Sequence, residues 1–150
     1  LWSTNSMSSH RNSFSGRTPM FNAKLRDEIM SLLTKNNIAF VNKAVYVQTH
    51  GPRFETPAEI AQLAAYADIV GMTCAHEADL FNEMEIPYAV ICMTDNLGNG
   101  LASHQISLEE FHAAVHKNLA TMESILKLVL AHFGPKAGII CCVVLLFIRL

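Results

Sequence analysis

Apolar residues along the chain alternate between the spacing of helices and that of strands. Over residues 22–36 they lie three and four positions apart, which predicts an amphipathic helix with Asn22 as its N-cap. Its apolar face holds Leu25, Ile29, Leu32 and Leu33. Residues 44–49 are rich in Val and Tyr, which predicts a half-buried strand. This alternation predicts an α/β layer fold.

Two short stretches carry the signature of a helix N-terminus. In Thr56-Pro57-Ala58-Glu59 the hydroxyl and the carboxylate can each satisfy a free backbone amide, and proline suits the first helical position. Ser107 and Glu110 repeat this capping box. We therefore expect one helix to about residue 66 and a long helix after Ser107. The apolar stripe of the long helix comprises Phe111, Val115, Met122, Leu126 and Val129.

The remaining segments complete a single domain with two less regular ends. Residues 68–72 and 88–94 are typical of short apolar strands, with an acidic helix over residues 76–85 between them. Residues 1–21 are expected to be irregular, residues 22–133 to form the domain, and residues 134–150 to be an apolar tail. The apolar run at 138–148 is about half of the roughly 20 residues that span a bilayer. A short buried strand, or a tail beyond the natural end of the domain, is favoured over a membrane anchor.

Composition narrows the class of partner. The chain has 150 residues, 51% apolar and 16% charged, which is typical of one globular domain. A net charge of −2 offers no basic field for nucleic acid or an anionic membrane, so a small-molecule ligand is favoured. The four cysteines form no CxxC pair, which indicates a reducing cytoplasmic setting. His112 and His116 have helical spacing, but no third ligand completes a metal site, and a solvated helix face is the preferred interpretation.

The segment 51–56 is a loop between a predicted strand and a capped helix, and it can present side chains. Glycine and proline fix the turn, so Phe54 offers an aromatic face and Glu55 a carboxylate beside it. This pairing suits a flat heterocycle with ring N–H donors. The alternative is core packing for Phe54 and a helix-end role for Glu55.

The loop is one of several short motifs that together resemble a known protein family. Tyr46-Val47, Gly51-Pro52-Arg53-Phe54-Glu55-Thr56, Val70-Gly71-Met72-Thr73 and Glu77 occur in the order and spacing seen in purine nucleoside and methylthio-nucleoside phosphorylases. The chain resembles the C-terminal half of that family over residues 22–130, most densely over 46–96. The resemblance implies part of a single-domain α/β fold with a mixed sheet and surrounding helices, usually in homotrimers. The N-terminal half of the family domain, which supplies the phosphate-binding Gly-rich loop, is expected to be missing.

The resemblance also implies roles for individual residues. The aromatic ring of Phe54 would pack against the purine, and Glu55 would accept a hydrogen bond from the ring N–H edge of a 6-oxopurine. Met72 would lie under the ribose and Tyr46 would touch the sugar. Thr73 would bind phosphate.

Three further positions bear on the substrate. Asp95 and Asn96 follow Thr94 at a strand end, where the family uses Asn or Asp to bind the leaving base; a simple turn would explain this composition equally well. We expect Asp95 to face the base. Leu108 falls where related nucleoside enzymes often carry a His for the 5'-hydroxyl, and an apolar residue there suits a 5'-methylthio group. A methylthioinosine-like substrate reconciles Glu55, Asp95 and Leu108.

The implied reaction is phosphorolysis. Inorganic phosphate, the co-substrate, attacks C1' of a purine nucleoside, and the purine leaves through an oxocarbenium-like transition state. The chemistry calls for preorganised polar groups and for no metal or other cofactor. Two alternatives are a non-catalytic purine-binding or assembly module and a nucleosidase that uses water.

Overall fold

The computed structural model describes residues 21–102, 107–134 and 140–149. The expectation of an irregular segment at 1–21 therefore falls, except for its last residue, outside the described part. Four strands form one sheet in the order β1-β2-β4-β3. They are β1 (Tyr46–Gln48), β2 (Ile69–Gly71), β3 (Tyr88–Leu97) and β4 (Ile140–Arg149).

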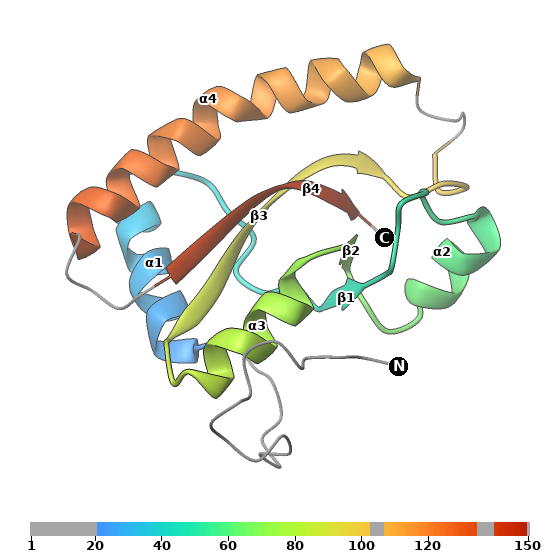
Figure 1. Cartoon of the computed structure of the whole chain (residues 1–150). Helices are drawn as coiled ribbons and strands as arrows, with labels where there is room; N and C mark the ends of the chain where they lie inside the picture. The colour runs from blue at the N-terminus through green and yellow to red at the C-terminus, as the bar shows by residue number, and fades with distance from the viewer. Residues whose placement is uncertain (1–20, 103–106, 135–139, 150) are drawn as a thin grey trace.

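The sheet is mixed, as predicted. Strand β1 runs parallel to β2, and β3 runs parallel to β4, whereas β2 and β4 are antiparallel. Of the two alternatives left open for the apolar tail, the structure shows a strand, β4, which lies between β2 and β3 (Figure 1). None of the described helices is long and apolar enough to cross a membrane.

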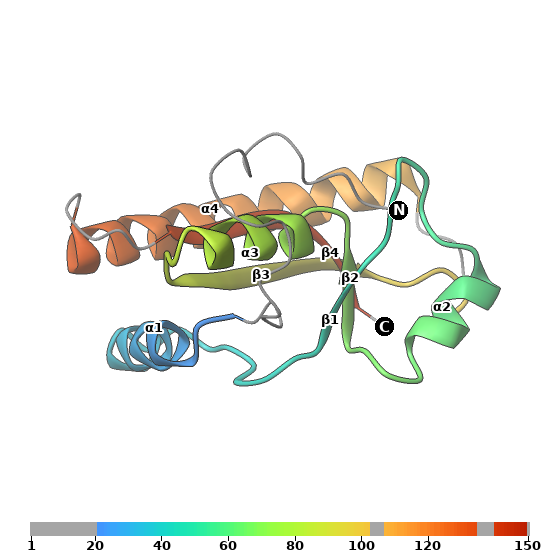
Figure 2. The same ribbon diagram turned by 60° about the horizontal axis from the view of Figure 1, so that its bottom comes forward.

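Four helices surround the sheet, and α1 and α2 lie at opposite ends of the molecule (Figures 1 and 2). Their bounds are α1 (Ala23–Lys35), α2 (Pro57–Leu63), α3 (Cys74–Glu83) and α4 (Leu108–Phe133). The Asn22 side chain accepts a hydrogen bond of 2.8 Å from the Leu25 amide, which confirms the predicted cap. Both predicted capping boxes are formed. Helix α2 ends three residues earlier than expected, because residues 64–66 form a turn.

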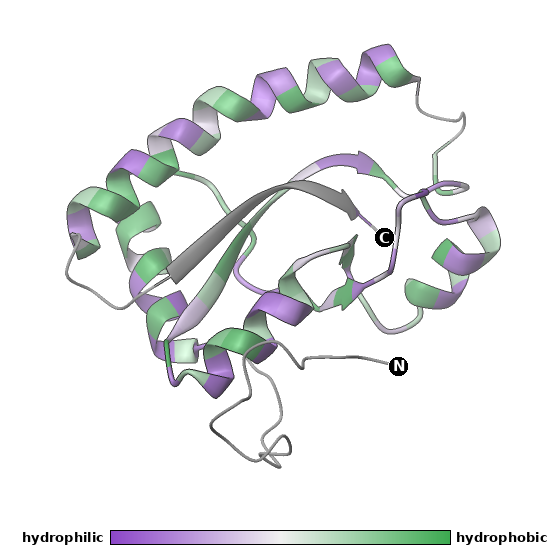
Figure 3. Ribbon diagram, viewed as in Figure 1, coloured by the Kyte–Doolittle hydropathy of each residue, from purple (hydrophilic) through white to green (hydrophobic). Residues whose placement is uncertain are grey.

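The main core lies where α1 and α4 pack on β3. The apolar face predicted for α1 is buried there against Ala89 of β3 and against Ile125 and Val129 of α4. In α4 the buried positions are Met122, Ile125 and Val129, so Ile125 takes the place expected for Leu126. Figure 3 shows apolar and polar segments alternating along α4, as expected for a helix with one face in the core. A second cluster, of Ile60 and Val70, joins α2 to β2 and holds the loop between them in place.

Candidate functional site

The loop after β1 is held against the end of β2 by a close approach of backbone to side chain. Gly51 has a φ of +62°, and a Cβ atom there would lie 2.6 Å from the sulfur of Met72. Glycine adopts this backbone conformation without strain, and any larger residue would require the Met72 side chain to shift. The structure therefore brings Met72 beside the loop that carries Phe54 and Glu55.

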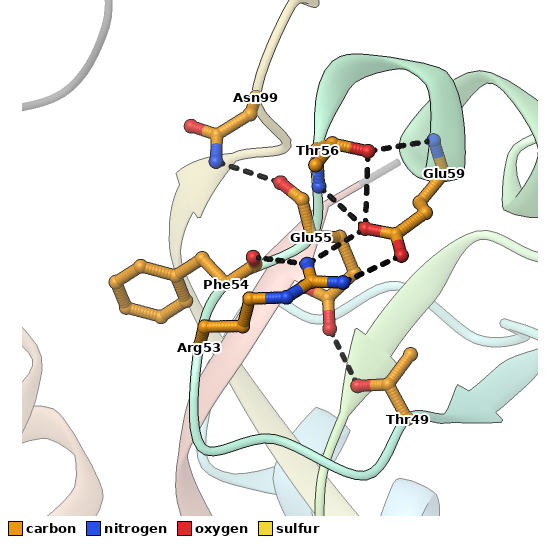
Figure 4. Close-up of polar contacts among 7 residues, drawn as sticks. All are labelled: Thr49, Arg53, Phe54, Glu55, Thr56, Glu59 and Asn99. Carbon is orange, nitrogen blue, oxygen red and sulfur yellow. Dashed lines mark hydrogen bonds and ion pairs between the residues drawn. The ribbon is translucent and has the colours of Figure 1, made fainter.

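Glu55 is a buried carboxylate with one oxygen left over. Its side chain is 5% exposed, and its Oε1 accepts a hydrogen bond of 2.5 Å from the Thr49 hydroxyl (Figure 4). Among the described residues, Oε2 has no hydrogen-bond partner although it is buried. The side-chain amide of Asn99 donates a hydrogen bond of 2.8 Å to the backbone carbonyl of Glu55. A buried acceptor without a partner is costly, so this oxygen is suited to a ligand that brings a donor.

Glu59, and not Glu55, serves the N-terminus of α2. Arg53 donates two hydrogen bonds of 2.8 Å to the Glu59 carboxylate, which also accepts from the backbone amide of Thr56 at 2.7 Å (Figure 4). The hydrogen bonds from Arg53, followed by those from Thr56, lower the pKa of Glu59 to about 2. The helix-end role considered for Glu55 is therefore wrong: the carboxylate of Glu55 is directed to Thr49 instead.

Phe54 is the exposed member of the loop. Its side chain is 44% exposed, and its ring points away from Glu59 (Figure 4). The ring centroids of Phe54 and Phe111 of α4 are 6.2 Å apart, within the range of favourable aromatic pairs. The core-packing alternative for Phe54 is thus not what the structure shows.

Asp95 and Asn96 lie in strand β3 and not in a turn; the turn begins after Leu97. Both residues line a pocket of about 250 Å³. The other lining residues are Leu97, Gly98, Asn99, Ala102 and Glu110. Within the described ranges, Asp95 Oδ2 and Asn96 Oδ1 are buried without a hydrogen-bond partner. Two residues that line the pocket therefore each carry a buried oxygen without a partner.

Asn118 of α4 sets the environment of Asp95. Its Nδ2 donates a hydrogen bond of 2.7 Å to Asp95 Oδ1 and one of 3.3 Å to the backbone carbonyl of Thr94. Burial raises the pKa of Asp95, and the hydrogen bond from Asn118 partly opposes this. Asp95 therefore holds its proton to a higher pH than an ordinary aspartate does.

Tyr46 is the first residue of β1, and its side chain reaches the start of α3. Its hydroxyl accepts a hydrogen bond of 3.3 Å from the Cys74 amide, and burial raises its pKa. The side-chain oxygen of Gln48 accepts a hydrogen bond of 2.6 Å from the backbone amide of Ala75, the next residue of α3. Thr73 is the exposed N-cap of the same helix, and its hydroxyl makes no capping hydrogen bond. The structure thus places Tyr46 and Thr73 at the same end of α3.

Leu108 is the first residue of α4 and is 71% exposed. It does not line the Asp95 pocket, although Glu110, one half-turn further along, does. His112 and His116 are exposed on α4, as expected for a solvated face. Over the residues that the structure describes, no group of three His, Cys, Asp or Glu side chains could hold a metal ion.

Sequence reasoning missed the neutral side chains that support the site. Thr49, Asn99 and Asn118 each donate to a residue that the sequence analysis singled out. Asn99 and Glu55 are 44 residues apart, and Asn118 and Asp95 are 23 apart. No local spacing signals such a pair, since each contact depends on how the sheet and α4 are assembled.

Comparison with known proteins shows which family the chain resembles in sequence. Residues 4–131 match the family described as the Phosphorylase superfamily. The chain is 37% identical over 102 residues to a probable 6-oxopurine nucleoside phosphorylase of Archaeoglobus fulgidus, covering 67% of this chain and 42% of that protein. It is 38% identical over 107 residues to a probable S-methyl-5'-thioinosine phosphorylase of Methanocaldococcus jannaschii, covering 71% of this chain and 40% of that protein.

The matched region contains all the candidate site residues and ends before β4. The chain spans about 40% of the length of these two relatives. The family match, which extends over most of the chain, and the two relatives point to the same conclusion. This chain belongs to the phosphorylase superfamily.

Proposed function

We propose that this chain carries the purine-binding part of a nucleoside phosphorylase, a pentosyltransferase that converts a purine nucleoside and phosphate into free purine and sugar 1-phosphate. The preferred substrates are 6-oxopurine nucleosides, including the 5'-methylthio form. The observation that carries this proposal is Glu55: a buried carboxylate, fixed at one oxygen by Thr49, with its other oxygen unpartnered.

The chemistry of Glu55 favours a 6-oxopurine over an adenine. An ionised carboxylate only accepts hydrogen bonds, and a 6-oxopurine presents an N1–H donor where adenine presents an acceptor nitrogen. A site built around a buried hydrogen-bonding group discriminates strongly against a ligand that leaves the group unpaired. The exposed ring of Phe54, next to Glu55, offers a stacking surface for the purine.

Asp95 is suited to the leaving purine. Burial raises the pKa of Asp95 and so favours its protonated form, which can share a proton with a purine nitrogen as negative charge develops there. Asn96 adds an unpartnered acceptor in the same pocket. Stabilising the departing base in this way accelerates cleavage of the glycosidic bond.

The sugar and phosphate would lie near Met72 and Thr73, between β2 and the start of α3. Met72 lies beside Gly51, and Thr73 exposes its side chain at the start of α3. We assign Met72 and Tyr46 to the ribose and Thr73 to phosphate, as the family resemblance implies. Leu108 is assigned to the 5'-substituent on the family resemblance alone, since its side chain is exposed and does not line the Asp95 pocket. Further phosphate contacts would come from sequence outside the matched 40% of the relatives.

The test is release of purine from inosine, adenosine, 5'-methylthioinosine and 5'-methylthioadenosine, each with and without phosphate. We expect release only with phosphate and preferentially from the two 6-oxopurine substrates. The Glu55→Gln variant should lose that preference, whereas Glu109→Gln, an exposed carboxylate at the start of α4, should keep it. Release without phosphate would establish a nucleosidase instead.

A second candidate is a purine-binding module without turnover. It is favoured by the unpartnered oxygens Glu55 Oε2 and Asp95 Oδ2, which suit the binding of a purine whether or not turnover follows. Calorimetric binding of hypoxanthine without phosphorolysis would identify this case. Trimeric assembly and a cytoplasmic location remain predictions, to be tested by light scattering and cell fractionation.

A further inference from the structure

Asn118 connects α4 to the end of β3. Its Nδ2 donates hydrogen bonds to the Asp95 carboxyl at 2.7 Å and to the Thr94 carbonyl at 3.3 Å. A side-chain amide nitrogen carries two hydrogens, so one Asn118 can serve both acceptors. The helix thereby fixes the carboxyl of Asp95 relative to the backbone of its own strand.

The partners of Asn118 also decide which way its amide points. Both partners accept hydrogen bonds, so a flipped amide would place its oxygen against two other oxygens. The nitrogen therefore faces Asp95 Oδ1. Because Oδ1 accepts this hydrogen bond, a proton on the Asp95 carboxyl resides on Oδ2.

Oδ2 is the oxygen of Asp95 that is left for a ligand. It is buried and has no partner in the part of the chain that the structure describes. Glu110, the other ionisable residue lining the pocket, uses its Oε2 to accept a hydrogen bond of 2.8 Å from the Ser107 amide. Of these two carboxyls, only Asp95 keeps a buried oxygen unpaired.

We propose that Asn118 is a positioning residue, which turns Asp95 so that Oδ2 alone exchanges a hydrogen bond or proton with a purine ring nitrogen. This inference rests on the function proposed above. As the bond between C1' and N9 breaks, its electron pair stays with the purine, and a phosphate oxygen bonds to C1'. The proton moves from Oδ2 to N7, and the Asn118 amide stabilises the Asp95 carboxylate that remains.

The test measures Asp95 directly in the 150-residue chain. The ¹³C carboxyl resonance of Asp95, assigned by its loss in Asp95→Asn, is followed with pH in the wild type and in Asn118→Leu. Hypoxanthine affinity is measured on the same samples by calorimetry. Lys117→Leu places the same side chain at the neighbouring exposed position of α4 and serves as the control.

We expect Asn118→Leu to raise the pKa of Asp95, since the donor that favours its charged form is lost. Hypoxanthine affinity should fall about tenfold, as for loss of one supporting hydrogen bond. Lys117→Leu should change neither quantity. If Asn118→Leu does not fold, Asn118→Asp keeps the shape and should raise the pKa of Asp95, because a second carboxylate opposes its ionisation.

Two results would overturn the inference while leaving the proposed function intact. One is an unchanged titration of Asp95 in the Asn118 variants. The other is a raised pKa with unchanged hypoxanthine affinity, which would show that the orientation set by Asn118 is not used by the base. A wild-type chain that binds no hypoxanthine would count against the proposed function itself, and the inference would fall with it.

Discussion

The hydroxyl of Thr49 donates a 2.5 Å hydrogen bond to Oε1 of Glu55, and this contact leaves Oε2 buried and unpaired among the described residues. Thr49 follows β1 directly, whereas Glu55 directly precedes the N-cap of α2. One neutral donor thus selects which oxygen of a buried carboxylate remains for a ligand. The same arrangement occurs at Asp95, where Asn118 donates a hydrogen bond to Oδ1 and Oδ2 remains unpartnered among the described residues.

The first prediction concerns Thr49. Thr49→Val keeps the shape but removes the donor, so Glu55 Oε1 loses its partner in a buried position. We expect the free energy of unfolding to fall by about 1–3 kcal/mol and hypoxanthine affinity to fall about tenfold. Urea unfolding and calorimetry measure the two effects. Thr34→Val, which removes an exposed hydroxyl on α1, is the control; equal losses in both variants would contradict the role of Thr49.

The second prediction is a pH dependence carried by Glu59. Arg53 and Thr56 lower its pKa to about 2, from an ordinary value of 4.5. Because the folded pKa is depressed, the stabilising contribution is complete above about 4.5 and is lost as the pH falls toward about 2. Glu59→Gln should therefore be less stable than the wild type at pH 7, with a difference that shrinks in acid.

Urea midpoints across this pH range measure that difference. The ion pair is exposed, so added salt should also reduce it. Glu109→Gln, at the exposed start of α4, should lack this pH-dependent loss. A difference that stays constant with pH would show that the Glu59 contacts do not depend on its charge.

The third prediction concerns the burial of Asp95. Burial raises its pKa above the ordinary 3.8, so the folded state disfavours its charged form at neutral pH. Asp95→Asn removes that charge and still offers an oxygen to Asn118. We expect the variant to be more stable than the wild type at pH 7, with the gain disappearing as the pH falls through the folded pKa to below 3.8.

Urea unfolding at pH 7 and in acid measures the gain in Asp95→Asn. Asp27→Asn, an exposed position on α1, should show no comparable gain at pH 7. A loss of stability in Asp95→Asn at pH 7 would mean that the charged carboxylate is held by a favourable contact, and it would contradict the burial argument.

The fourth prediction separates backbone conformation from packing at Gly51. Gly51 and Gly134 have similar positive φ angles, +62° and +67°, but only Gly51 has a neighbour where a Cβ would lie. The backbone cost of alanine should be about 1–2 kcal/mol in the left-handed region and about 1–3 kcal/mol at Gly134, whose ψ of 175° at positive φ is adopted essentially by glycine alone. Gly51→Ala should cost about 1–3 kcal/mol more, because the new methyl group overlaps Met72. Equal losses in urea unfolding would show that Met72 moves aside freely.

The loop of the candidate site was predictable from local sequence, whereas the burial of its side chains was not. The loop that carries Phe54 and Glu55 follows from turn residues and a capping box, and the family resemblance pointed to purine binding. That Glu55 is buried and Phe54 exposed was not predictable, because an acidic residue before a helix is equally suited to capping. The burial of Glu55 depends on Thr49, which no capping rule connects to it.

The sequence by itself determined where α1, α2 and α4 begin, whereas α3 begins two residues before the predicted start and lacks a side-chain cap. Asn22, Thr56 and Ser107 act on amides within three residues, so their hydrogen bonds form wherever the helix forms. Such features involve neighbours along the chain, and short-range rules suffice for them.

Only the tertiary structure decided that β4 lies between β2 and β3 and that Asn118 meets Asp95. Backbone hydrogen bonds between strands are the same for every sequence, so strand order depends on the packing of the whole sheet and not on local pattern. The partner of a polar side chain depends in turn on which segments that packing brings together. The oxygens left free for a ligand, Glu55 Oε2 and Asp95 Oδ2, are a consequence of assembly.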